Sequence, residues 1–231
     1  MEKKPFVSLS KTWAVSLGSL AAGTLLAVTI VSGSAQQGPP PGGGAPPPPP
    51  APPTAGMNLE IVEGTATYTV SEQFVGIDFP NDAMGSSSKV AGTIGIAKDG
   101  SIVPGSKLTV DLSALKSDQD MRDNFAKTRT LEVAKYPMAE FVPTKVSGLP
   151  LMVPTTGQSG FRLTGNMTIH GVTKEVTFQG IATYGRDSTI SGIAKTSFGF
   201  DTFGVAVPKI SRLASVDNKI DLALQFKFKR S

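Results

Sequence analysis

The sequence predicts an all-β fold, an extended antiparallel eight-stranded barrel with a short helical insertion. In Phe161–Tyr184, apolar residues recur at every second position in two arms joined by Gly171–Lys174. Such alternation is typical of strands with one buried face, and a short Gly-containing connection joins two of them into a hairpin. Each arm is about ten residues or roughly 33 Å long, more than the usual strand. Long amphipathic strands favour a closed sheet, because closure removes exposed edges.

The same alternation predicts further strands on both sides of this hairpin. They are Thr65–Val70, Phe74–Phe79, Lys89–Ala97, Lys107–Leu112, Ala139–Val146, Thr189–Phe200 and Ile220–Phe228. With the two arms of the hairpin this gives eight or nine strands. Turn or loop residues are expected at Pro80–Asp82, Asp99–Gly100 and Gly157–Gly160, and Val205–Asp217 is predicted to be irregular. The pattern contains no crossover helix, which favours an antiparallel sheet.

One short helix is predicted to interrupt the strands. Ser117–Asp120 supplies candidate N-cap side chains, and Met121, Phe125 and Ala126 follow at helical spacing. Strand alternation resumes at Ala139, so this helix is an insertion in the sheet.

Residues 1–35 carry an export pattern. Lysines precede an uncharged run, Trp13–Val31, and small residues follow at Ser32–Gln36. A basic start, an apolar middle and a small-residue exit are typical of a signal peptide, while the length of the run also suits a membrane anchor. Both alternatives place the rest of the chain outside the cytoplasm: periplasmic or otherwise extracytoplasmic, secreted, or tethered to the inner membrane.

Residues 36–60 are predicted to form a disordered linker, and residues 61–231 the barrel domain. Proline dominates the linker in Pro39–Pro41 and Pro46–Pro50. Proline removes backbone donors and fixes φ, so this segment is expected to act as a semi-rigid spacer.

Charge and composition exclude several function classes. The net charge is +4, and the leader supplies two of these charges, since Lys3, Lys4 and Lys11 are opposed only by Glu2. The remaining lysines are scattered, which indicates a solvated surface and no nucleic-acid partner. Cysteine is absent, and the one histidine, His170, stands alone before a turn. We therefore expect no enzymatic activity, no metal site and no covalent cofactor.

The predicted lumen is apolar. All twelve phenylalanines except Phe6 lie after the linker, and their rings favour a dry interior. An eight-stranded barrel is either filled by side chains or open to one slender ligand. Inward glycines are expected at Gly92, Gly165, Gly180 and Gly192; they mark bends in the wall, free volume in the lumen, or both.

Three segments carry a resemblance to a known family: Ser117–Val146, Phe161–Phe178 and Ile193–Val205. They contain the pair Arg122-Asp123, then Lys-Tyr-Pro, a Gly-Val-Thr-Lys turn, and Phe-Gly followed by an aliphatic residue. In order and spacing the chain resembles the YceI-like family of exported bacterial proteins. The chain departs from the family pattern at Phe200, where an arginine is usual.

The resemblance implies a lipocalin-like barrel whose lumen holds a polyisoprenoid chain, such as a polyprenyl phosphate or a quinone precursor. We therefore expect a bound isoprenoid lipid and a role in its binding, transport or storage in the cell envelope. The residues expected to line the lumen are Ile94, Val110, Phe125, Phe141, Leu163, Met167, Phe178, Ile190, Phe198, Phe200 and Leu224. Candidates for contact with a phosphate head group are Arg122, Arg129 and Lys195, because cationic side chains bind phosphate.

An interaction or stress-related scaffold module of the envelope is the alternative. It predicts a filled barrel with an exposed apolar patch on its outer surface. Membrane contact through the N-terminal segment is expected if the leader is not cleaved. A homodimer is also left open.

Overall fold

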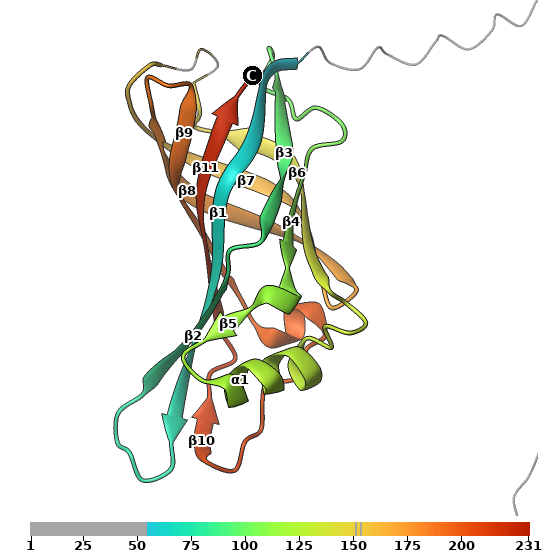
Figure 1. Ribbon diagram of the computed structural model, residues 1–231, viewed down its shortest axis with the longest axis vertical. Coiled ribbons are helices and arrows are strands. Elements are labelled where there is room, and N and C mark those ends of the chain that lie inside the picture. Colours follow the sequence, from blue (N-terminus) through green and yellow to red (C-terminus); the bar gives the residue numbers. More distant parts are fainter. Residues whose placement is uncertain (1–54, 151, 153) are drawn as a thin grey trace, which may run out of the picture. The chain divides into compact units, whose positions relative to one another are not determined.

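Eight antiparallel strands close into a barrel in the computed structural model, which describes residues 55–150, 152 and 154–231 (Figure 1). Their order around the ring is β1 (Ala55–Phe74), β3 (Val90–Ala97), β4 (Lys107–Asp111), β6 (Met138–Ser147), β7 (Gly157–Ile169), β8 (Val172–Tyr184), β9 (Thr189–Phe198) and β11 (Ile220–Arg230). The ring is closed by β11 against β1, where Leu59 lies opposite Arg230 and Thr69 opposite Asp221. The predicted eight-stranded all-β barrel is therefore confirmed.

The predicted hairpin is β7–β8, with Ile169 opposite Val172 at its turn and Gly157 opposite Tyr184 at its far end. The turn itself is His170-Gly171, and both residues have positive φ, 53° and 75°. Two positive φ angles are the geometry of a two-residue turn whose twist matches the flanking strands. The hairpin is longer than predicted, because the expected loop Gly157–Gly160 is paired with the end of β8.

The strand β1 is long enough to belong to the barrel and to an extension beyond it. Its first residues pair with β3, and its last part pairs with β2 (Asn81–Ser87) and β10 (Leu213–Val216). The two-residue strand β5 (Lys116–Ser117) extends this sheet from β2. Figure 1 shows the β1–β2 hairpin and β10 projecting from one end of the barrel.

Three predictions in this region were wrong. The run Phe74–Phe79 is no strand, since β1 ends at Phe74 and the residues after it connect β1 to β2. The strand β2 begins at Asn81, within the predicted turn, and β10 lies within the segment predicted to be irregular. Neither strand has a continuous apolar face, so periodicity gave no signal for them.

The helical insertion consists of α1 (Asp120–Phe125) and η2 (Ala126–Thr130), a turn of π-helix. The N-cap residue is Gln119, which makes no side-chain cap hydrogen bond, so the expected capping by Ser117–Asp120 is not present. Instead the carboxylate of Asp123 accepts a hydrogen bond of 2.7 Å from the Ser117 amide and ties the helix to β5. Two short 3-10 turns complete the fold, η1 (Leu112–Ala114) and η3 (Phe200–Phe203). Phe200 therefore begins a 3-10 turn and does not extend β9.

The N-terminal predictions fall mostly outside the described residues. The expected signal or anchor, residues 1–35, and the linker up to residue 54 belong to the part of the chain without a description. The predicted linker range 36–60 is too long, because β1 begins at Ala55 and pairs there with β3. Among the helices of residues 55–231 that the structure describes, none is long and apolar enough to cross a bilayer.

Candidate functional site

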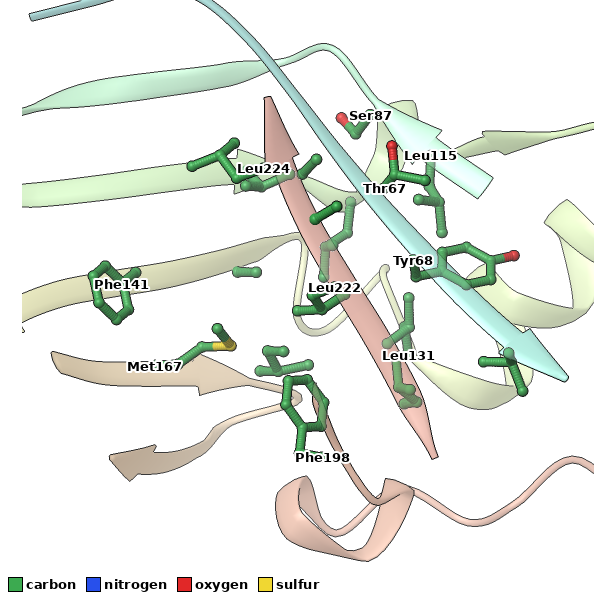
Figure 2. A pocket seen from close by; sticks show the side chains of 18 of the residues that line it. Thr67, Tyr68, Ser87, Leu115, Leu131, Phe141, Met167, Phe198, Leu222 and Leu224 are labelled. Carbon is green, nitrogen blue, oxygen red and sulfur yellow. The ribbon is translucent and has the colours of Figure 1, made fainter. Parts of the chain in front are cut away.

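The barrel encloses an apolar cavity of about 410 Å³. Figure 2 shows Phe141, Met167, Phe198, Leu222 and Leu224 around this space, carried by four of the barrel strands. Because side chains alternate between the two faces of a strand, every second residue of each strand reaches the interior. The volume falls within the range of about 300–1,000 Å³ typical of ligand pockets.

All eleven residues predicted to line the lumen border this cavity. Nine of them belong to barrel strands, whereas Phe125 comes from α1 and Phe200 from η3. Their contact with a lipid stays a prediction. Sequence reasoning missed residues at one end of the cavity, above all Tyr68, Glu72, Leu131 and Arg212. Tyr68 lies in a strand that was predicted and could have been included, whereas the others lie where no strand was expected.

Aromatic rings cover the cavity wall without filling the cavity. Phe141 and Phe178 meet edge to face with ring centroids 5.3 Å apart, and Phe198 and Phe203 do so at 4.8 Å. Offset and edge-to-face pairs add roughly 0.5–1.5 kcal/mol beyond the burial of their area. The rings therefore form a stable lining, and a filled barrel, which the scaffold alternative predicts, does not agree with the remaining volume.

The inward glycines are sites of close packing in the wall. A Cβ atom added at Gly165 would lie 2.5 Å from the carbonyl oxygen of Val142 and 2.7 Å from the ring of Phe141. A Cβ atom at Gly180 would lie 2.7 Å from the ring of Phe161 in the same way. The phenylalanine rings occupy the space that glycine leaves. Of the two alternatives for these glycines, free volume in the lumen therefore does not agree with Gly165 and Gly180, where a neighbouring ring occupies the space.

A charged group borders the cavity at the end that carries α1. The guanidinium of Arg122 lies 2.8 Å from the Glu72 carboxylate and also contacts Asp118. The side chains of Arg122 and Glu72 are only 15% and 10% exposed. Burial alone would lower the pKa of Arg122, but the hydrogen bond and the charge of Glu72 raise it. Arg122 is therefore a fixed cation with two carboxylates already beside it.

The phenol of Tyr68 lies close enough to Arg122 and Glu72 for both charges to act on its pKa, and Tyr68 also borders the cavity. Burial raises the pKa of Tyr68 above its ordinary value of 10.0, although the charge of Arg122 acts in the opposite direction. A neutral phenol is the form that such a half-buried site favours. Tyr68 therefore keeps its hydroxyl proton at neutral pH, so its phenol is a hydrogen-bond donor.

The three head-group candidates are not brought together. Arg122 borders the cavity, but Arg129 and Lys195 are exposed and do not line it. Lys195 points away from the cavity because successive side chains of β9 face opposite sides, and its neighbour Ala194 faces inward. Arg212, which sequence reasoning did not select, is a second cation at the cavity.

The described residues hold no cluster of three or more histidine, cysteine, aspartate or glutamate side chains that could bind a metal. His170 occupies the β7–β8 turn, where its ring meets Tyr136 edge to face at 4.8 Å. Its Nε2 atom lies 3.6 Å from the carboxylate of Glu132. These contacts join the hairpin turn to the segment that follows the helical insertion, which is a structural task.

Comparison with known proteins agrees with this architecture. A chain of Saccharophagus degradans, described as a polyisoprenoid binding domain implicated in plant cell wall breakdown, has the same fold with a TM-score of 0.56. It shares 11% identity, and the match covers 76% of this chain and 99% of that one. BcnA of Burkholderia cenocepacia matches with a TM-score of 0.53 at 17% identity, over 71% of this chain and 95% of BcnA.

Sequence comparison finds a relative in Pseudomonas putida strain W619, a UPF0312 protein that is 37% identical over 102 residues. These residues are 43% of this chain and 45% of the relative, so the chain spans less than half of that protein's length. The family model of the YceI-like domain matches residues 63–228. Because that match extends over more than half of the chain and its fold is the one described above, the chain belongs to the YceI-like family.

Proposed function

We propose that this protein binds an isoprenoid lipid in the barrel, as a carrier or store and without catalysis. The observation that carries the proposal is the apolar cavity of about 410 Å³, which aromatic and aliphatic side chains surround. The polyisoprenoid binding domain of S. degradans, which has this fold, supports the same ligand class. A polyprenyl phosphate or a quinone precursor is the ligand we propose.

The energetics of an apolar ligand fit such a cavity. Each buried methylene group contributes about 0.8 kcal/mol, so even three isoprene units would supply on the order of 10 kcal/mol before the costs of association. Few polar contacts are then needed for retention. Since the guanidinium of Arg122 already contacts two carboxylates, we expect tight binding of the chain and weak discrimination between head groups.

We place the barrel outside the cytoplasm, in the cell envelope. The support for this location is the basic and apolar leader within residues 1–35, which is followed by a proline-rich segment. A lipid with a long hydrocarbon tail has negligible solubility in water, so its movement between membranes requires a protein that shields the tail.

The test is direct analysis of the protein purified from a bacterial envelope without detergent. Native mass spectrometry is expected to show a bound species, and organic extraction should release a prenyl lipid in near-equal amount to the protein. In parallel, delipidated protein should take up geranylgeraniol with one site per barrel. Recovery of no lipid, together with no uptake of geranylgeraniol, would overturn the proposal.

A further inference from the structure

The connection between β1 and β2 exposes an unusual amount of apolar surface. Within Val75–Pro80, which we call the apolar tip, the side chains of Val75, Ile77 and Phe79 are 65%, 53% and 79% exposed. Large apolar side chains gathered on a surface usually mark an interaction site. The scaffold alternative predicts such a patch together with a filled barrel, whereas in this protein the patch occurs together with an open cavity.

The apolar tip lies at the end of the cavity. Phe74, which directly precedes it, lines the cavity, as do Arg212 and Leu213 of the adjacent segment. The amide of Val75 donates a hydrogen bond of 3.1 Å to the carbonyl oxygen of Arg212, and Phe74 pairs with Leu213. Backbone hydrogen bonds therefore join the tip to the start of β10. The tip follows directly after Phe74, which borders the cavity, and the β1–β2 hairpin that carries it projects from this end of the barrel (Figure 1).

Cationic side chains accompany the tip. Lys209 and Arg212 lie in the segment between η3 and β10, and both are exposed. The only charged residue within the tip is Asp78, so the tip and the segment Lys209–Arg212 together carry one net positive charge. Exposed phenylalanine and aliphatic side chains beside lysine and arginine are the combination that enters the boundary between head groups and acyl chains of a bilayer.

We infer that the apolar tip inserts into the surface of an anionic lipid bilayer and sets the adjacent end of the barrel cavity against the membrane. Val75, Ile77 and Phe79 would enter the acyl boundary, while Lys209 and Arg212 contact anionic head groups. This contact is separate from any anchor in the leader, and it does not depend on which lipid occupies the cavity. It supplies a route along which an apolar ligand passes between bilayer and cavity without crossing water.

A site-specific probe tests this inference on the full chain. The chain has no cysteine, so Asp78→Cys can carry one environment-sensitive fluorophore at the tip. Gln179→Cys, exposed on the outer face of β8, is the matched control. With vesicles of equal parts phosphatidylcholine and phosphatidylglycerol, we expect a blue shift and quenching by brominated acyl chains at residue 78 only. An equal response at both positions, or none at residue 78, would overturn the inference.

Substitution of two equally exposed isoleucines tests whether membrane insertion is specific to the tip or is a general effect of exposed apolar side chains. Ile77 and Ile181 are both 53% exposed, the first in the tip and the second on the barrel wall. Ile77→Asp should weaken the vesicle response of the residue-78 probe by at least about tenfold in lipid concentration, whereas Ile181→Asp should leave it unchanged. Lys209→Gln should weaken it only on vesicles with anionic lipid. Circular dichroism confirms that each variant is folded.

Two further outcomes discriminate this inference from other accounts. A blue shift that grows with protein concentration in the absence of vesicles would show that the tip contacts a second copy of the chain, and would overturn the membrane contact. Leu224→Trp, which narrows the cavity, is expected to keep the vesicle response. Absence of lipid binding in the unsubstituted chain, with a retained vesicle response, would thus refute the proposed function alone, whereas lipid binding without any vesicle response would refute only the membrane contact of the tip.

Discussion

Narrowing the cavity from one strand position should reduce lipid binding without loss of the fold. Leu224 of β11 borders the cavity and is half-buried, and Figure 2 shows its side chain among those around the open space. Its neighbour Gln225 is exposed and does not border the cavity. Leu224→Trp and Gln225→Trp therefore place the same ring on opposite faces of one strand.

The size of the effect follows from the volume that the ring occupies. Tryptophan exceeds leucine by about six non-hydrogen atoms, so the ring displaces about one isoprene unit from the cavity. At about 0.8 kcal/mol for each buried methylene, five carbons correspond to about 4 kcal/mol, or close to a thousandfold in Kd. Overpacking is expected to lower the free energy of unfolding by about 1–3 kcal/mol, which a domain of this size tolerates.

The assay is retention of radiolabelled geranylgeraniol during gel filtration, with Kd determined by competition. Both variants are made in a Trp13→Phe background, so that the new indole is the only one in the chain and reports its surroundings by emission wavelength. Leu224→Trp should bind the label far more weakly than Gln225→Trp, whose Kd should equal that of the parent. Equal affinities in two folded variants would refute the reasoning that the ligand occupies the interior of the barrel.

Three other predictions concern stability. Gly165→Ala should lower the free energy of unfolding by about 1–3 kcal/mol, because the added Cβ meets the adjacent strand and a phenylalanine ring. Gly160→Ala is the control and should change it by less than about 0.5 kcal/mol, since its added Cβ meets nothing nearer than 4.0 Å. Thermal unfolding measures both variants, and similar losses would contradict the close packing at Gly165. The pKa of Tyr68 is raised in the folded chain, so the neutral phenol stabilises the fold. This stabilisation is fully present below pH 10, the pKa in the unfolded chain, and is lost as the pH rises through the higher pKa of the folded chain. Urea unfolding from pH 8 to about 12 should show this loss in the parent and less of it in Tyr68→Phe. Glu72→Gln should cost about 1.5–3 kcal/mol, since it removes a charged partner of Arg122; a double-mutant cycle with Arg122→Met that shows no coupling would contradict the pair.

Period-2 alternation was the strongest signal in the sequence, and it located both the barrel and its inward face. Leu163, Met167 and Phe178 were placed in the lumen because each occupies the apolar phase of a long strand, and the structure puts all three at the cavity. This inference works because a strand sends successive side chains to opposite sides, so one register decides every position along it.

The signal failed where a strand has no apolar face or where an apolar run has no strand. In β2, exposed Met84 alternates with Gly85 and Ser87, whose buried positions carry almost no apolar side chain. In the apolar tip, Ile77 and Phe79 alternate like a strand but are exposed to solvent. Periodicity reports the sidedness of a segment, and it does not report whether a partner strand is present.

The charged end of the cavity shows a second limit. Arg122 was singled out as a phosphate ligand, but Glu72 lies fifty positions earlier in the chain and contacts it only because β1 extends past the barrel. Lys195 was expected at the same site, and the phase of β9 turns it outward. A side chain's charge is a property of the sequence, whereas its partners are a property of the fold.

The sequence by itself determined that the chain forms a closed sheet with an apolar interior, because alternation along each strand is local and needs no knowledge of the neighbours. Only the tertiary structure decided that the interior stays open, that phenylalanine rings rest on Gly165 and Gly180, and that Arg122 is shared by two carboxylates. The volume of the cavity and the ion-pair partners of a side chain depend on which residues from distant strands come into contact. The curvature of the closed barrel determines those contacts.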